Sequence, residues 1–158
     1  MEYSEKEIED CLYDNPHMLN LGLNKDGVGW EMYRQLDLKD YGIADLVIFD
    51  WSRSVIYVIE VKRNPSKPAD FGQCLRYMEA MRKSGLKVRG IVAANGMSGD
   101  SPWVLSSLKH VQQWTFSPSL ARGILWKYEP KGCWVKGTDD TGEPLRYILE
   151  IKGEGGTN

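Results

Sequence analysis

The sequence predicts an α/β fold in which helices flank a mixed β-sheet, and the order of its elements carries this prediction. An amphipathic helical pattern spans residues 4–14. Two apolar segments at 41–50 and 54–64 then form a strand pair, and a second helical pattern at 68–84 leads into a buried strand at 87–96. Strands that alternate with helices along the chain in this way indicate an α/β domain.

The first helix is marked at both ends and along one face. Ser4 can accept a hydrogen bond as the N-cap, and Glu7 stands three residues later, as in a capping box. Asn15-Pro16 ends the helix, because a residue that precedes proline disfavours helical backbone. The apolar stripe of the helix consists of Ile8, Cys11 and Leu12.

The strands follow from alternation of side chains. A first strand is predicted over residues 29–38, and a turn follows at Lys39-Asp40. Its predicted common side holds Trp30, Met32, Arg34, Leu36 and Leu38. The segments 41–50 and 54–64 are joined by a short turn at 51–54, which predicts a hairpin.

The second helix also has clear limits. Pro68 stands in its first turn and Asp70 lies near the positive end of the helix dipole. Gly85 follows the last turn as a cap. The core stripe consists of Phe71, Cys74, Leu75, Met78 and Met81.

Beyond Gly96 the pattern is weaker. It predicts a short helix at 102–110 and three strands, at 123–130, 133–137 and 145–153. The polar segment 153–158 is expected to be a disordered tail. We therefore expect a single domain over residues 1–152, with a core at about 4–95 and a C-terminal extension at about 97–152.

The composition predicts a cytosolic protein without a membrane or secretory signal. A chain of 158 residues can bury a substantial core without metal or disulfide support. No segment approaches the about 18 consecutive apolar residues of a membrane span, and the acidic start MEYSEKEIED is unlike a signal peptide. The cysteines are far apart, odd in number and lack C-x-x-C spacing, so they indicate neither a disulfide framework nor a structural zinc site. They are Cys11, Cys74 and Cys133.

The distribution of charge is more informative than its sum. A formal charge of -2 argues against a protein that coats nucleic acid nonspecifically. Between residues 62 and 89, however, basic residues outnumber the acids Asp70 and Glu79. They are Lys62, Arg63, Lys67, Arg76, Arg82, Lys83, Lys87 and Arg89. Such a run fits a face that binds a polyanion, and it fits a solvated helix face equally well.

Asp45 interrupts a segment that is otherwise apolar on both sides. Its predicted side holds Ile43, Val47 and Phe49, and the other side holds Ala44, Leu46 and Ile48. This pattern is typical of a central strand covered on both faces. An aspartate in such a strand must be paired, hydrogen-bonded or bound to a metal, because an isolated buried charge costs several kcal/mol.

The turn of the hairpin decides which residues oppose each other. If the loop has two or four residues centred on Ser52-Arg53, residue 50 pairs with residue 55, and counting outward brings Asp45 opposite Glu60. A loop of three residues would shift this register. Directly opposed side chains have Cβ atoms about 4.5 to 5.5 Å apart, so two carboxylates there repel each other.

A divalent cation between the two carboxylates would turn this repulsion into a binding site. Lys62 shares a face with Glu60 and stands one strand repeat further, about 6.6 Å along the chain, where it can address a group that the ion holds. In isolation, Glu60 and Lys62 are also explained as a strand end that reaches solvent.

The arrangement of Asp45 followed by Glu60-Val61-Lys62 resembles the core motif of the PD-(D/E)XK nuclease superfamily, with Ala44 in place of the proline. Gln73 and Tyr77 are similar to the Q-x-x-x-Y motif of its RecB-like branch, and EKEIEDCLYDNPHML is similar to the first helix of that branch. Order and spacing over residues 4–95 are closest to the C-terminal domain of archaeal and actinobacterial mismatch and branched-DNA endonucleases.

This resemblance implies a restriction-endonuclease-like core with the order α-β-β-β-α-β and a metal-dependent nuclease that cuts DNA. The expected substrate is a flap, a mismatch or a junction, and the expected assembly is a homodimer. It implies a Mg²⁺ site, for which Mn²⁺ would substitute, formed by Asp45, Glu60 and the Val61 carbonyl, with Glu5 contacting the ion through water. Lys62 would orient the attacking water, and Gln73 and Tyr77 would brace the lysine and the scissile phosphate.

Several alternatives stay open at this point. At about 100° per residue Glu5 lies nearer the apolar stripe of the first helix than Glu9, which favours Glu5 as the additional acid. A solvated helix start also explains these acids, and helix packing also explains Tyr77. The alternative function is a non-catalytic module of the same fold that binds nucleic acid or a protein partner. The sequence does not distinguish DNA from RNA as the target, and it does not distinguish an endonuclease from an exonuclease.

Overall fold

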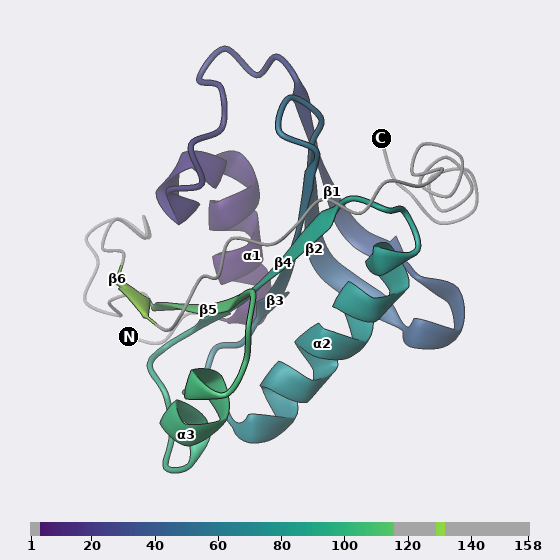
Figure 1. Cartoon of the computed structure of the whole chain (residues 1–158). Coiled ribbons are helices and arrows are strands. Elements are labelled where there is room, and N and C mark those ends of the chain that lie inside the picture. Colours follow the sequence, from purple (N-terminus) through teal and green to yellow (C-terminus); the bar gives the residue numbers. More distant parts are fainter. Residues whose placement is uncertain (1–3, 116–128, 132–158) are drawn as a thin grey trace.

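The predicted order of helices and strands is present in the computed structural model, which describes residues 4–115 and 129–131 (Figure 1). The helices are α1 (Glu5–Asp14), α2 (Pro68–Arg82) and α3 (Ser101–Ser106), with 3-10 turns η1 (Pro16–Leu19) and η2 (Lys39–Tyr41). The strands are β1 (Trp30–Asp37), β2 (Ile43–Asp50), β3 (Val55–Val61), β4 (Lys87–Ala94), β5 (Val111–Thr115) and β6 (Glu129–Lys131). The capping box of Ser4 and Glu7 is formed at the start of α1.

The strands of the described residues form one mixed sheet in the order β1-β2-β3-β4-β5-β6. Strand β2 is antiparallel to both β1 and β3, and short turns make both connections. Strand β4 is parallel to β3 and β5 is parallel to β4, with α2 and α3 in the connections. Strand β6 is antiparallel to β5.

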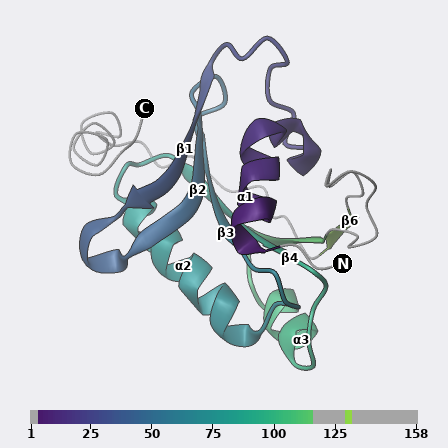
Figure 2. The ribbon, with the colours of Figure 1, turned by 180° about the vertical axis from the view of Figure 1, so that it is seen from behind.

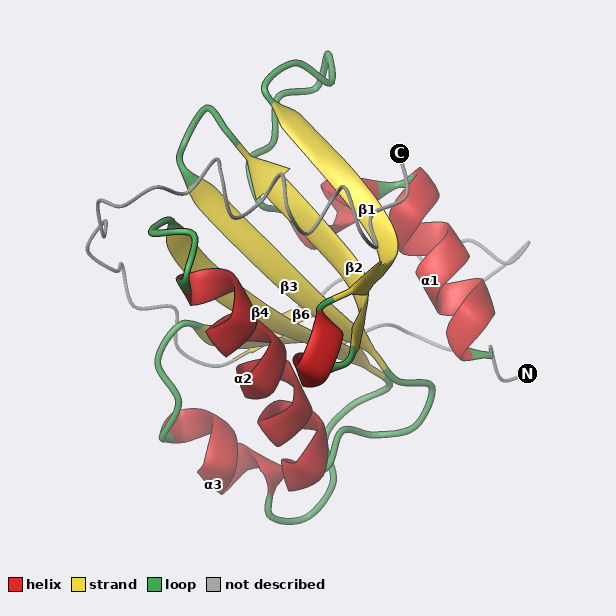
Figure 3. Ribbon diagram, turned by 90° about the vertical axis from the view of Figure 1, so that its right-hand side faces the viewer, coloured by secondary structure: helices red, strands yellow, loops and turns green. Residues whose placement is uncertain are grey.

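Helices cover both faces of the sheet. Figures 1 and 2 show α1 on one face and α2 on the other, and Figure 3 shows α3 beside the first turns of α2. Each face has its own apolar cluster. The α1 face buries Ile8, Leu12, Leu46, Ile48 and Ile59, among others. The α2 face buries Val47, Phe49, Val58, Phe71 and Met78, among others.

Side-chain alternation reverses at Gln35 in β1. Trp30 and Met32 pack on the α1 face, whereas Leu36 and Leu38 belong to the cluster on the α2 face. Gln35 has a φ of 48°, in the left-handed region, and this turns the strand over. The prediction that one side of the strand carries all the alternate residues from 30 to 38 is therefore wrong beyond Arg34.

The same reversal occurs opposite Gln35, at Asp45 in β2. Ala44 and Val47 are three residues apart and yet belong to the same cluster. The ladder between the strands pairs Arg34 with Leu46, skips one position on each strand, and resumes beyond it. The predicted assignment of Ala44 to the opposite side from Val47 is wrong for this reason.

The C-terminal part was predicted less well. The short helix is confirmed, but it begins and ends earlier than predicted, at Ser101 and Ser106. Strand β5 was not predicted, because Gln112 and Gln113 obscure its apolar pattern. Of the three predicted C-terminal strands, the first, at 123–130, overlaps the described strand β6 in its last two residues. The other two predicted strands lie outside the described residues, as do the predicted tail and Cys133.

Within the residues that the structure describes, no helix has the length and apolar character that crossing a bilayer requires.

Candidate active site

The β2–β3 hairpin brings the Asp45 side chain next to that of Glu60. Its turn occupies residues 51–54, and Asp50 pairs with Val55, as predicted for a loop of four residues. The ladder ends at the pair of Leu46 and Ile59, and Asp45 and Glu60 are the next residues on the two strands. Asp45 Oδ2 also accepts a hydrogen bond of 2.8 Å from the Val61 amide, which holds the aspartate against β3.

Glu60 is an acid buried beside another acid. Only 2% of its surface is exposed, and its Oε2 atom has no hydrogen-bond partner among the described residues. Burial, followed by the adjacent Asp45 carboxyl, raises the pKa of Glu60 to about 10. Two carboxylates that share a site cannot both ionise readily without a cation, so this end of the hairpin favours a positive ligand.

Lys62 lies on the Glu60 side of this pair. Its Nζ atom is 3.9 Å from Glu60 Oε1. Its backbone amide donates a 2.8 Å hydrogen bond to the Ala93 carbonyl, which continues the pairing of β3 with β4 past the last residue of the strand. The lysine is therefore anchored to the sheet at its backbone, while its ammonium group lies near Glu60.

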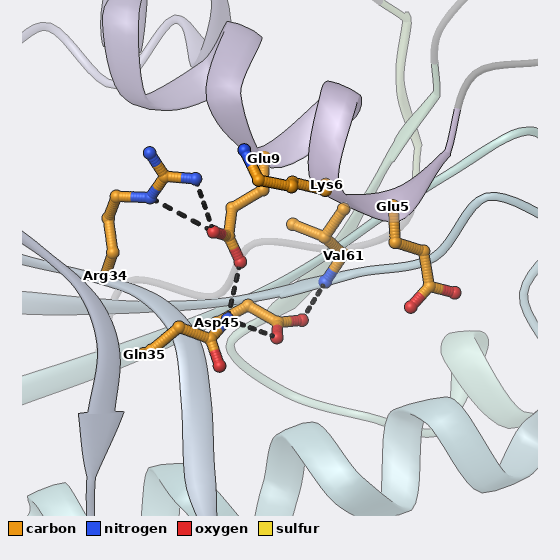
Figure 4. Close-up of a pocket in the computed structure, with 7 residues that line it drawn as sticks. All are labelled: Glu5, Lys6, Glu9, Arg34, Gln35, Asp45 and Val61. Atoms are coloured by element: carbon orange, nitrogen blue, oxygen red, sulfur yellow. Dashed lines mark hydrogen bonds and ion pairs between the residues drawn. The ribbon is translucent and has the colours of Figure 1, made fainter.

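A pocket of about 490 Å³ opens between α1 and the ends of β1, β2 and β3. It is lined by Glu5, Lys6, Glu9, Arg34, Gln35, Asp45 and Val61 (Figure 4). Asp45 therefore faces an open space on the α1 side as well as Glu60. A ligand that enters this pocket can reach the Asp45 carboxylate.

Helix α1 reaches the pocket through a hydrogen-bonded network around Glu9. Arg34 donates to Glu9 Oε2 from Nε at 3.1 Å and from Nη2 at 2.7 Å, and Nη2 also contacts Asp10. Gln35 Nε2 donates to Glu9 Oε1 at 2.7 Å and to Asp45 Oδ1 at 3.3 Å. Figure 4 shows the Gln35 amide between the two carboxylates.

The prediction that Glu5 lies nearer the buried side of α1 than Glu9 is wrong. Glu9 is 7% exposed, whereas Glu5 is classed among the exposed residues. The helical pattern omitted Arg34, a cation on β1 whose pairing lets Glu9 be buried. Glu5 still lines the pocket, and its carboxylate accepts a 3.3 Å hydrogen bond from the Arg63 amide. Its role as the additional acid stays a prediction.

Gln73 and Tyr77 of α2 are joined to each other. Gln73 Nε2 donates a 2.8 Å hydrogen bond to the Tyr77 hydroxyl, as their spacing of one helical turn allows. The Tyr77 ring is buried and lies against Gly42, ahead of β2. This contact places the pair beside the strand that carries Asp45, and the predicted bracing of Lys62 stays a prediction.

Ser66 fixes the loop that follows Lys62. It is fully buried, and its Oγ donates to Gln113 Oε1 of β5 at 2.8 Å. Its carbonyl accepts hydrogen bonds from Ser98 Oγ at 2.9 Å and Ser101 Oγ at 2.7 Å, and its amide donates to the Gly96 carbonyl at 2.9 Å. The loop from Lys62 to α2 is thus tied to the segment between β4 and α3 and to β5.

The residues present fit a divalent cation that keeps much of its water. Asp45 and Glu60 offer oxygen ligands, and the buried Glu60 Oε2 lacks a partner in the described part of the chain. That part contains no group of three or more His, Cys, Asp or Glu side chains placed to hold a metal. Mg²⁺ is commonly bound by one or two carboxylates together with waters and phosphate oxygens, so two carboxylates suffice for it.

Sequence reasoning missed Arg34, Gln35 and the buried role of Glu9. One signal for Arg34 was available, because this residue interrupts the apolar side of the first predicted strand, and a charge on such a side requires a partner. Gln35 gave no comparable signal, since a glutamine on the polar side of a strand is ordinary.

No family model matches this chain, and no curated protein matches it. Among solved structures, a repair endonuclease from Pyrococcus abyssi is similar, with a TM-score of 0.58 and 24% sequence identity. The match covers 75% of this chain and 49% of that chain, so it spans about half of the other protein's length. This likeness confirms the restriction-endonuclease-like fold, while membership of the RecB-like branch stays a prediction.

Proposed function

We propose that this protein is a Mg²⁺-dependent deoxyribonuclease that hydrolyses phosphodiester bonds in DNA. The observation that carries the proposal is the pair of opposed acids, Asp45 and Glu60, with the Lys62 ammonium 3.9 Å from Glu60 Oε1. A second acid beside a buried acid is unfavourable unless a cation joins them. Similarity to the fold of a repair endonuclease supports DNA as the substrate.

The cation would be held by Asp45, Glu60 and the Val61 carbonyl, and Mn²⁺ is expected to replace Mg²⁺. When bound, it supplies a nucleophilic hydroxide near neutral pH and offsets the negative charge of the phosphate. Lys62 orients the attacking water and stabilises the charge that develops on the phosphate, as a compact ammonium group can.

Three further residues complete the proposed site. Glu5 contacts the cation through water, which its exposed position at the pocket permits. Gln73 and Tyr77 act as a hydrogen-bonded pair that braces Lys62 and the scissile phosphate. A flap, a mismatch or a junction is the proposed kind of substrate, and cleavage inside the strand is the proposed mode.

A cleavage assay with several labelled DNA forms tests the proposal. We expect the wild-type protein to cut at least one form with Mg²⁺ or Mn²⁺ and none with EDTA. Asp45→Ala and Lys62→Ala are expected to abolish cutting while the circular dichroism spectrum stays unchanged. Asp50→Asn is the matched control, because Asp50 is a buried acid of the same hairpin at its other end.

A second function is favoured by the formal charge of -2, which is low for a nuclease that tracks along DNA. In that case the protein is a non-catalytic module that binds nucleic acid or a protein partner. Binding of the labelled DNA without cleavage under any metal would support the module and contradict the nuclease.

A further inference from the structure

Gln35 has a backbone conformation that a strand residue rarely adopts. It lies in the second half of β1 with a φ of 48°, and it stands opposite Asp45 at the position that the ladder skips. Few residues other than glycine occupy this left-handed region, and they cluster where the surrounding structure fixes them. As a result of this backbone conformation, the Gln35 side chain points toward α1 and lines the pocket.

The Gln35 amide bridges two carboxylates. Its Nε2 atom donates to Glu9 Oε1 at 2.7 Å and to Asp45 Oδ1 at 3.3 Å (Figure 4). The other Asp45 oxygen, Oδ2, accepts from the Val61 amide at 2.8 Å. Gln35 and Val61 thus donate to different oxygens of Asp45, and a carboxylate offers about four lone-pair sites, so further sites stay available for a ligand.

The bridge is fixed at its far end. Glu9 is buried and receives two hydrogen bonds from Arg34 on the oxygen that Gln35 does not use. Arg34, Glu9, Gln35 and Asp45 therefore form one continuous chain of hydrogen bonds between α1 and β2. Both oxygens of Glu9 are engaged in this chain, which leaves its carboxylate turned toward Gln35.

We propose that Gln35 is a positioning residue that orients Asp45 for the cation, and that Glu9 acts through Gln35. The inference rests on the proposed function, since Asp45 needs this orientation in order to bind the ion. Side chains that hydrogen-bond a metal ligand commonly set its direction and alter metal affinity. Here the Gln35 amide sets the direction of Asp45 and also connects α1 to the site.

Gln35→Gly separates this role from a purely structural one. Glycine accepts the left-handed backbone without strain, so the variant is expected to unfold at the same temperature as wild type or a higher one. It also removes the amide, so the Kd for Mn²⁺, measured by titration calorimetry without DNA, is expected to rise about 10-fold to 100-fold. Asn20→Gly is the matched control, because Asn20 is exposed and has a φ of 54° away from the pocket.

A double-mutant cycle tests whether Glu9 acts through Gln35. Glu9→Gln alone is expected to weaken Mn²⁺ binding, and in the Gln35→Gly background it is expected to add less than about twofold. Independent, multiplying effects would show that Glu9 reaches the cation directly and would overturn that half of the inference.

The outcomes also separate this inference from the proposed function. A Kd for Gln35→Gly within twofold of wild type would overturn the positioning role and leave the nuclease proposal standing. A wild-type protein that binds no Mn²⁺ and cuts no DNA would overturn both.

Discussion

The two ends of the β2–β3 hairpin each bury a carboxylate that has one oxygen without a hydrogen-bond partner among the described residues. At the turn this acid is Asp50, whose Oδ1 accepts a 2.6 Å hydrogen bond from Ser52 Oγ and whose Oδ2 lies 3.9 Å from Arg53 Nε. At the open end it is Glu60, with the Lys62 ammonium at 3.9 Å. The two acids are equally buried, at 2% exposed.

The difference between the ends is the second acid. Asp50 has a cation and a hydroxyl as neighbours, so its charge is balanced by the turn that it helps to fix. Glu60 has a cation and a further carboxyl, that of Asp45, as neighbours. Asp50 and Glu60 are thus alike in burial, and the open end differs because a second, partly buried carboxyl lies beside the buried acid there.

The largest expected effect is on catalysis. Asp45→Asn should lower the cleavage rate by at least about 100-fold, since it removes a charge that acts on the reacting phosphate through the cation. Asp50→Asn should change the rate by less than about threefold. Initial rates on labelled DNA at saturating Mg²⁺ measure both, and equal losses in the two variants would remove the distinction between the ends.

The next effect is on stability at the turn. Arg53→Met should lower the free energy of unfolding by about 3 kcal/mol, because it leaves the buried Asp50 without its cation. Arg53 also donates to the carbonyls of Leu21 and Gly22, which adds to the loss. Urea unfolding measures it, with Lys6→Met as the control, because the exposed pair of Lys6 and Asp10 contributes little. A loss no greater than that of the control would contradict this account.

The third effect is a gain of stability at the open end. The raised pKa of Glu60 means that the folded, metal-free protein binds a proton that the unfolded chain releases above its usual pKa of 4.5. Stability should therefore fall as the pH rises from 4.5 to about 10, and Glu60→Gln should remove this dependence and be more stable than wild type at pH 8.

Urea unfolding at several pH values with EDTA measures this effect of Glu60. Glu79→Gln is the control, because the side chain of Glu79 is 66% exposed, and it should leave the profile unchanged. Parallel profiles for wild type and Glu60→Gln would contradict the assignment.

The smallest effect concerns α2. Tyr77→Phe removes the acceptor of the Gln73 amide and keeps the ring against Gly42, so it should cost about 1 kcal/mol of stability. If the pair braces Lys62, the cleavage rate should also fall, by about 10-fold. Tyr41→Phe, on a partly buried ring ahead of β2, is the control. An unchanged rate in Tyr77→Phe would assign the pair to packing alone.

The sequence allowed the hairpin to be predicted well because its turn is short. Four loop residues at 51–54 leave one symmetric register, in which Asp50 pairs with Val55 and Leu46 pairs with Ile59, and Asp45 and Glu60 follow directly after that last pair. Helix α1 was predicted from Ser4 for a similar reason, since a cap acts through neighbours in the chain. Such features are local and are encoded within a few residues.

The remainder of the site depends on contacts between distant segments. The reversal of side-chain alternation in β1 occurs at a glutamine, so no glycine in the sequence marks it. The Gln35 side chain instead forms hydrogen bonds with Glu9 and Asp45, which lie on other elements. The burial of Glu9 depends on Arg34, 25 residues away. Strand β5 contains Gln113, a buried polar residue whose side chain accepts from Ser66 Oγ and donates to the carbonyls of Gly96 and Trp114.

Ser66 limits how this protein can change in the course of evolution. Its hydrogen bonds fix the number of residues between Lys62 and α2, since an insertion there would shift Ser66 out of register with Ser98, Ser101 and Gln113. Substitutions of the exposed side chains of that loop would still be tolerated, because they leave its length unchanged. Changes in length are tolerated better at 24–28, which lies at the opposite end of the hairpin next to the Asp50 turn.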